Sequence, residues 1–136
     1  MNLNYGGTGG GSGNIVNGNT ITNVTGQGAV TGITYAGSTT NGVTSIYSNT
    51  LNNITSTGTG GTVVGITCSS PNANIYSNTI GTLASSGAAS VVTGISCSAA
   101  TSSAIYKNKV YDLSPSTAGG AAKGFTLFSR TKFKNN

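Results

Sequence analysis

Charged residues are almost absent from this sequence, and their absence excludes several kinds of chemistry. Residues 1–106 contain no lysine, arginine, aspartate, glutamate or histidine, and Asp112 is the only acidic residue of the chain. No histidine is available for a catalytic triad. No histidine or carboxylate stands near Cys68 or Cys97 to complete a metal site. We therefore expect a protein that is not an enzyme and that uses neither a metal nor a cofactor.

Long apolar runs are also missing. No stretch approaches the ~18 consecutive apolar residues of a membrane span, so we expect no membrane insertion. Met1–Asn14 is polar and rich in glycine, and it lacks the basic start and apolar stretch of a signal peptide. Strong helix formers are scarce and β-branched residues are plentiful, which favours strands. Because Val, Ile and Leu recur at fixed places, we expect an ordered, all-β chain.

The positive charge lies entirely in the last part of the chain. The net charge of +5 comes from Asp112 and six basic residues, which are Lys107, Lys109, Lys123, Arg130, Lys132 and Lys134. A basic tail can bind nucleic acid or an anionic surface, or it can be a solvated terminus that aids solubility. We favour the solvated terminus and expect no nucleic-acid partner.

A nine-residue motif occurs four times. An aliphatic residue opens it, Asn follows three positions later, and further aliphatic residues stand at five and eight. The copies begin at almost equal intervals along the chain, and they are Val16–Val24, Ile46–Ile54, Ile75–Leu83 and Ile105–Leu113. Such spacing indicates a solenoid, in which each repeat buries its apolar face against its neighbours.

A second block, with Gly before Ile or Phe, follows each copy of the motif. Breaker clusters such as Ser56–Gly61 separate the blocks and are typical of loops. Each repeat therefore contains three predicted short strands, which make one coil of a parallel β-helix with coils about 4.8 Å apart. We predict about four coils of about 30 residues each. The expected divisions are a Gly-rich lead-in at 1–14, the β-helix domain at 15–127 and a basic C-terminal tail or cap at 128–136.

Residues 15–127 resemble the repeats of right-handed parallel β-helix proteins, the pectin-lyase-like superfamily. The third copy, which begins Ile75-Tyr76-Ser77-Asn78-Thr79-Ile80, is most similar to the Gly/Ser/Thr-rich repeats of secreted or cell-surface bacterial proteins. The resemblance implies a right-handed solenoid in which one Asn of each turn stacks as a ladder, here Asn19, Asn49, Asn78 and Asn108. Enzymes of the superfamily use a carboxylate pair or an acidic cluster that holds Ca²⁺. This chain has neither.

Stacking the repeats turns each motif position into a column, and four aliphatic columns are the predicted core. Their members are Val16, Ile46, Ile75 and Ile105; Ile21, Leu51, Ile80 and Val110; Val24, Ile54, Leu83 and Leu113; and Ile33, Ile66, Ile95 and Phe125. A further column holds Gly32, Gly65, Gly94 and Gly124, which indicates either a positive φ or a place too tight for a Cβ.

Two more columns carry reactive or aromatic side chains. Cys68 and Cys97 are predicted neighbours within disulfide range, but in-register Cβ atoms point the same way, so we favour two buried free thiols over a bridge. Tyr47, Tyr76 and Tyr106 follow the first aliphatic column and are expected to point outward. They form either a platform for sugar rings or a partner, or a ladder that stabilises only its own surface.

The preferred function is a non-catalytic, extracellular structural or adhesive solenoid. Its open ends predict self-association end to end into a filament, or a place in a longer parent chain. The alternative is a carbohydrate-binding module that uses Tyr47, Tyr76 and Tyr106 to bind polysaccharide. Ice binding is less well supported, because the column Thr20, Thr50 and Thr79 ends in Lys109. Charge-poor solenoids rich in Ser, Thr and Asn are typical of exported surfaces, so we expect an extracellular or cell-surface location, with an export signal outside this sequence.

Overall fold

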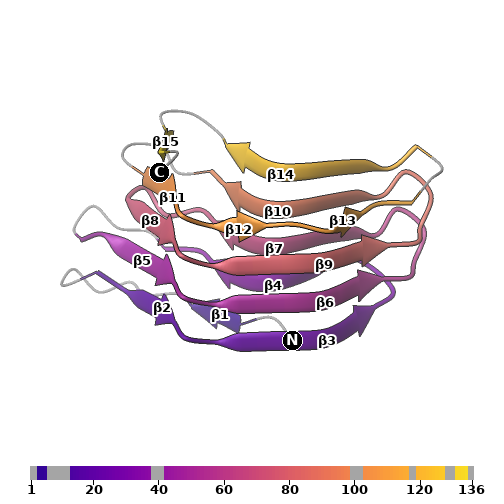
Figure 1. Ribbon diagram of the computed structural model, residues 1–136, viewed down its shortest axis with the longest axis horizontal. Coiled ribbons are helices and arrows are strands. Elements are labelled where there is room, and N and C mark those ends of the chain that lie inside the picture. The colour runs from indigo at the N-terminus through magenta and orange to yellow at the C-terminus, as the bar shows by residue number, and fades with distance from the viewer. Residues whose placement is uncertain are drawn as a thin grey trace.

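The chain winds through three parallel β-sheets and enters each sheet once per coil (Figure 1). The computed structural model describes residues 3–5, 13–37, 42–98, 103–116, 119–127 and 131–134. Within those ranges all regular structure is β-strand. None of the described residues forms a helix that is long and apolar enough to cross a membrane. The prediction of an all-β parallel solenoid with three strands per coil is confirmed.

Each sheet collects the equivalent strands of successive coils. Sheet A contains β1 (Leu3–Tyr5), β4 (Val30–Tyr35), β7 (Thr62–Cys68), β10 (Val91–Cys97) and β14 (Ala121–Leu127). Sheet B contains β2 (Ile15–Asn17), β5 (Thr44–Tyr47), β8 (Ala73–Tyr76), β11 (Ser103–Tyr106) and β15 (Thr131–Lys134). Sheet C contains β3 (Thr20–Gly26), β6 (Thr50–Ser56), β9 (Thr79–Ser85) and β12 (Lys109–Val110), and β13 (Leu113–Ser114) also pairs with β9.

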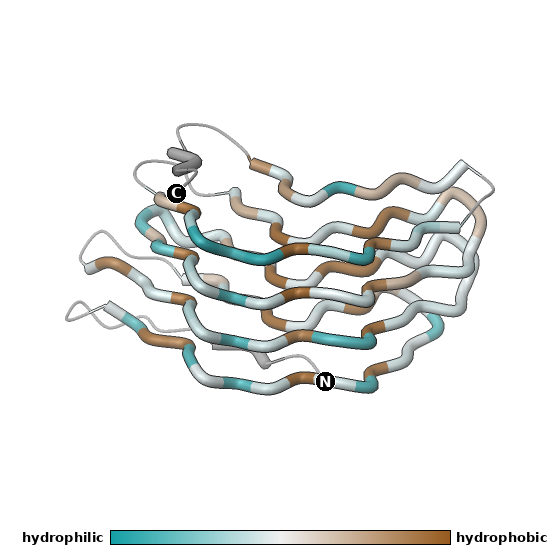
Figure 2. Tube along the Cα trace, in the orientation of Figure 1, coloured by the Kyte–Doolittle hydropathy of each residue, from teal (hydrophilic) through white to brown (hydrophobic). Residues whose placement is uncertain are grey.

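The register of the sheets matches the predicted columns. Ile46 pairs with Val16 on one side and with Ile75 on the other, and Ile75 pairs with Ile105. The other three aliphatic columns pair in the same way. Figure 2 shows the result as apolar bands that recur at equivalent places on neighbouring coils. The nearly constant repeat length therefore brings each side chain onto its equivalent in the next coil.

Left-handed backbone conformations place aliphatic residues that are three positions apart on the same inner side. In a regular strand, Ile21 and Val24 would face opposite sides of the sheet. Between them Asn23 has a φ of 58°, and its equivalents Asn53, Thr82 and Asp112 have φ values of 54°, 48° and 51°. A second such set stands just before the Asn column, at Gly18, Ser48, Ser77 and Lys107. These residues are the corners that bend each coil.

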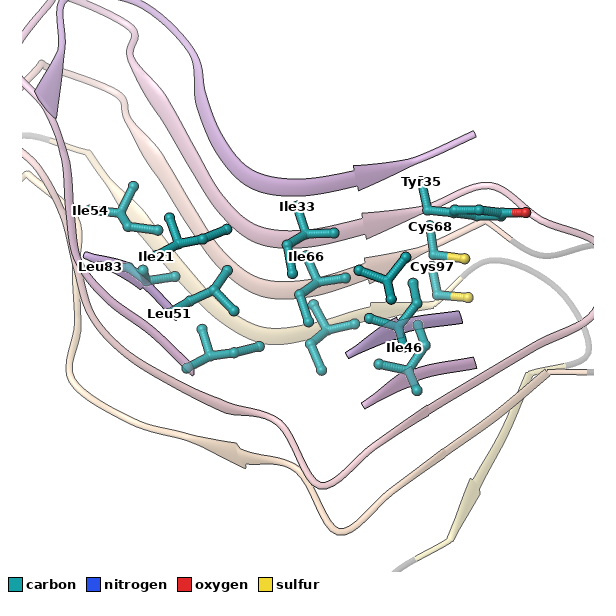
Figure 3. Packing of buried hydrophobic residues seen from close by; sticks show 14 of the residues in the cluster. Ile21, Ile33, Tyr35, Ile46, Leu51, Ile54, Ile66, Cys68, Leu83 and Cys97 are labelled. Carbon is teal, nitrogen blue, oxygen red and sulfur yellow. The ribbon is translucent and has the colours of Figure 1, made fainter. Parts of the chain in front are cut away.

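The interior of the solenoid is a single apolar core enclosed by the three sheets (Figure 3). The aliphatic columns supply most of it, and the other buried members are Val30, Val63, Val92, Tyr35, Cys68, Ala73 and Cys97. Four members of the predicted columns, which are Val24, Val110, Leu113 and Phe125, are only partly buried. All four lie in the first or last coil, where a column has a neighbour on one side only.

The sheets extend beyond the expected limits of 15–127. β1 pairs with β4, so that Leu3 is in register with Ile33, and β15 pairs with β11, so that Phe133 is in register with Ile105. Each strand adds a partial row at one end of the solenoid. The predicted count of about four coils is slightly high when counted as turns. The four copies of the motif are separated by about three full turns.

Candidate functional site

The Asn column forms a continuous hydrogen-bonded ladder inside the turn between sheets B and C. The Oδ1 of Asn78 accepts hydrogen bonds from the backbone N–H and the Nδ2 of Asn49, at 3.0 and 2.9 Å. Asn78 donates in the same way to Oδ1 of Asn108, at 3.0 and 2.8 Å, and its Nδ2 also donates to the carbonyl oxygen of Ile46. Asn19 begins the series by donating to Asn49. The predicted ladder is confirmed, and its amides satisfy backbone groups that the turn leaves unpaired.

The two ends of the ladder are bonded differently from its middle. Asn49 and Asn78 each divide their Nδ2 hydrogens between the next Asn and a carbonyl of the preceding coil. The Nδ2 of Asn19 instead donates one hydrogen to the carbonyl oxygen of Asn17, in its own turn. Asn108 donates to Ile75 O and to Tyr106 O, which also belongs to its own turn. Each end member of the ladder therefore makes one hydrogen bond within its own turn, in place of a bond that an inner member makes to a neighbouring coil.

The Gly column marks a close approach between sheets A and C. A Cβ built on Gly32 would overlap the side chain of Leu51, and one on Gly94 would overlap Val110. A Cβ on Gly65 would lie 2.6 Å from the carbonyl oxygen of Gly94. None of these glycines has a positive φ. Of the two predicted reasons for the column, lack of room for a Cβ is the one that the structure shows.

The three tyrosines form a stack along the outside of sheet B. The ring centroids of Tyr47 and Tyr76 are 4.9 Å apart and those of Tyr76 and Tyr106 are 5.0 Å apart, with planes parallel to within 5°. All three side chains are half-buried. Because the rings stack on one another, Tyr76 has a ring on each of its two faces. Ring edges and hydroxyl groups are therefore what the middle of this stack presents to solvent.

The stack also changes the acidity of its central member. Desolvation raises the pKa of Tyr76 above its usual value, and repulsion from Tyr47 and Tyr106 raises it further. The phenol is thus held in its neutral form over the whole physiological range. It can donate or accept a hydrogen bond, but it supplies no charge for acid–base chemistry.

Cys68 and Cys97 are neighbouring, buried free thiols, as favoured from the sequence. In Figure 3 their Sγ atoms lie one below the other and point the same way, below Tyr35 of the same column. A hydrogen bond to Cys97 and burial both raise the pKa of the Cys68 thiol well above its usual range. A thiol of this kind is a poor nucleophile and behaves as a small apolar side chain. No group of three or more His, Cys, Asp or Glu side chains occurs among the described residues.

Among the side chains that the structure describes, the charged ones lie exposed on the last coil. The ammonium group of Lys109 lies 4.9 Å from the ring centroid of Tyr111, a distance at which a cation is attracted to an aromatic face. The ring of Tyr111 in turn covers Gly81 of the preceding coil. In the column of Thr20, Thr50 and Thr79, the last coil therefore has the ammonium group of Lys109 in place of a threonine hydroxyl.

Sequence analysis did not identify the hydroxyl groups that close the loops. Ser56 and Ser85 are buried and donate to the carbonyl oxygens of Gly28 and Gly61, at 2.7 and 3.0 Å. Ser103 is also buried and accepts a hydrogen bond from the backbone of Ala73. These serines stand in breaker clusters or at strand ends, where serine is common, so no signal separated them from exposed serines.

Comparisons of the chain with known protein families, with curated proteins and with solved structures found no significant match.

Proposed function

We propose that this chain is a non-catalytic structural or adhesive solenoid of an extracellular or cell surface, related to right-handed, pectin-lyase-like β-helices. The Asn ladder that the resemblance implied supports that relationship. The repeated positions support the structural role, because most of them are occupied by contacts between neighbouring coils. The aliphatic columns are buried, the Asn amides bond to one another, and the Tyr rings cover each other's faces.

The observation that carries the proposal is the contrast between inner and terminal positions of the two aliphatic columns of sheet C. Leu51, Ile54, Ile80 and Leu83 are fully buried between neighbouring coils, while Val110 and Leu113 of the last coil are only partly buried. An added coil, from a second copy or from a longer parent chain, would bury these residues in the same register. End-to-end continuation is therefore part of the proposed function.

Light scattering at rising protein concentration tests whether the chain continues with a second copy. The expected result is a mass that rises above the 13.3 kDa of a single chain, in steps of one chain. A monodisperse mass near 13.3 kDa at high concentration would exclude self-association. Antibody labelling of intact cells that express the native gene tests the surface location, and labelling that requires permeabilised cells would contradict it.

Binding to polysaccharide is the second candidate, and the row of Tyr47, Tyr76 and Tyr106 is the observation that favours it. Three half-buried phenols at a spacing of about 5 Å offer hydroxyls and ring edges along one outer line. The expected result is retention on an insoluble polysaccharide that is lost in Tyr76→Ala and reduced in Tyr76→Phe, which keeps the stack but removes one hydroxyl. Retention of both variants as strong as that of the parent protein would contradict a role for the tyrosines.

A further inference from the structure

The Gly column ends in an open position at the C-terminal end of the solenoid. In each inner step, the Gly of sheet A faces the first aliphatic residue of sheet C in the following coil. Gly32 faces Leu51, Gly65 faces Ile80 and Gly94 faces Val110. A Cβ built on Gly124 would meet no atom within 4 Å. Gly124 thus keeps the shape of the column without the side chain that fills it elsewhere.

Apolar side chains of the last coil are left partly exposed at the same end of the solenoid. Val110, Leu113 and Phe125 pack against the core but are only partly buried, and Leu127 is 37% exposed. Their equivalents in the preceding coil, which are Ile80, Leu83, Ile95 and Cys97, are all 0% exposed. The end of the last coil is therefore an apolar surface with a slot for one branched side chain.

We propose that this surface binds the N-terminal coil of a second copy of the chain, head to tail, with the second copy's Ile21 seated over Gly124. Ile21 is the first-coil member of the column that continues through Leu51, Ile80 and Val110, the three residues that fill the inner slots. The proposal rests on the proposed function, because it assumes that the solenoid continues end to end, and it names the contacts by which it does so.

The bonding at the two ends of the Asn ladder fits this arrangement. Ladder bonds run in one direction, from each Asn to Oδ1 of the Asn in the next coil. A second copy placed on the last coil brings the Oδ1 of its Asn19 to the end of the ladder at Asn108. The Nδ2 of Asn108 then donates to this oxygen instead of to Tyr106 O. Only head-to-tail stacking preserves this direction.

The distribution of charge also favours head-to-tail stacking. Lys107, Lys109 and Lys123 lie exposed in the last coil, whereas residues 13–37 of the first coil carry no charged side chain. Two C-terminal ends in contact would bring like charges together. A C-terminal end on an N-terminal end avoids this repulsion.

The partial rows at the two ends compete with this contact. β15 pairs with β11, which is the place that the second copy's β2 would take in sheet B. β1 pairs with β4, which is the place of β14 from the copy below. Sheet C has no such additional row among the described residues. Full stacking therefore requires that β15 of one molecule and β1 of the next be displaced, which lowers the affinity of the association.

The first experiment uses two single variants of the full chain, Thr20→Cys and Lys109→Cys, one of them isotopically heavy. Both positions are exposed members of the column Thr20, Thr50, Thr79 and Lys109, so that three coil spacings, about 14 Å, separate them within one molecule. Head-to-tail stacking places them one spacing apart between molecules. A short thiol cross-linker should then join Thr20→Cys to Lys109→Cys in the mixture. Products that join two identical variants, or no product while light scattering shows oligomers, would overturn the proposal and leave the proposed function standing.

The second experiment tests the slot itself. In the monomer a Cβ at position 124 has room, so Gly124→Ala should keep the melting temperature of the parent protein but weaken association about tenfold, because the methyl group occupies the place of Ile21. Lys132→Pro, which weakens β15, should strengthen association. If Gly124→Ala associates as well as the parent protein does, the slot is not the contact. If neither the parent protein nor Lys132→Pro associates at all, the chain does not self-assemble. The part of the proposed function that has the solenoid continue with a second copy then fails as well.

Discussion

The third and fourth coils share one motif and differ in the burial of their side chains in sheets A and C, while Ile75 and its equivalent Ile105 in sheet B are both fully buried. Ile75, Ile80, Leu83 and Ile95 of the third coil are fully buried, while Val110, Leu113 and Phe125 of the fourth are partly exposed. The third coil carries no charged residue, and the fourth carries Lys107, Lys109, Asp112 and Lys123. Position in the stack, and not the motif, determines how much each residue contributes to stability.

Truncating one leucine in each coil should give the largest difference. Leu83 and Leu113 are paired members of one column. Leu83→Ala should lower the free energy of unfolding by about 2–5 kcal/mol, because it leaves a cavity between two coils. Leu113→Ala should cost less than half as much, since solvent already reaches that side chain. Denaturant titration measures both, and equal losses would show that the fourth coil is packed as tightly as the third.

The Asn ladder should show the same dependence on position. Asn78→Ala leaves the Asn49 donors and the Ile46 carbonyl oxygen without their partners in a buried turn, at a cost of about 1–3 kcal/mol. Asn19→Ala removes an end member that is half-buried and that makes one of its bonds within its own turn, so the loss should be smaller. An unchanged melting temperature for Asn78→Ala would contradict the ladder as a source of stability.

Adding a methyl group to the Gly column should distinguish the coils in the same sense, through overpacking instead of a cavity. Gly94→Ala places a Cβ against Val110 and the Gly124 carbonyl oxygen, and overpacking of this kind costs about 1–3 kcal/mol. Gly124→Ala should change the free energy of unfolding by no more than about 0.5 kcal/mol, as surface substitutions do. Thermal and denaturant unfolding of the two variants, compared at concentrations where both are monomeric, measure the difference.

Alkaline pH should have the most gradual effect on stability, through the buried thiol of Cys68. The pKa of Cys68 is raised in the folded protein, so above the ordinary thiol pKa of about 8.5 the unfolded chain loses a proton that the folded chain retains. Stability is therefore unaffected below that pH and falls above it, by up to about 1.4 kcal/mol per pH unit for one group. Cys68→Ala should reduce the slope between pH 8.5 and 10. If the slope of stability against pH does not change on this substitution, the folded and unfolded states do not differ in the protonation of Cys68.

Columns were predictable because they depend only on spacing. An almost constant repeat length brings equivalent residues together, so the Asn ladder, the Gly column, the outward Tyr row and the Cys68–Cys97 pair all followed from counting positions. The extent of the sheets was less predictable. β15 has Phe133 where other copies have Val or Ile, and it follows Ile105 after a slightly shorter interval than the one between the other copies. β1 is followed by a polar, glycine-rich sequence whose composition is typical of a linker.

By itself, the sequence determined the periodicity, the strand-rich character and the identity of each column, since these follow from which residue types recur and how far apart. Only the tertiary structure decided which reason accounts for the Gly column, how the Tyr rings share their faces, and which column members are buried. These depend on distances between chain segments that no periodicity specifies. Gly94 and Gly124 are the same residue in the same motif, yet one is enclosed by the next coil and the other opens onto the end of the solenoid.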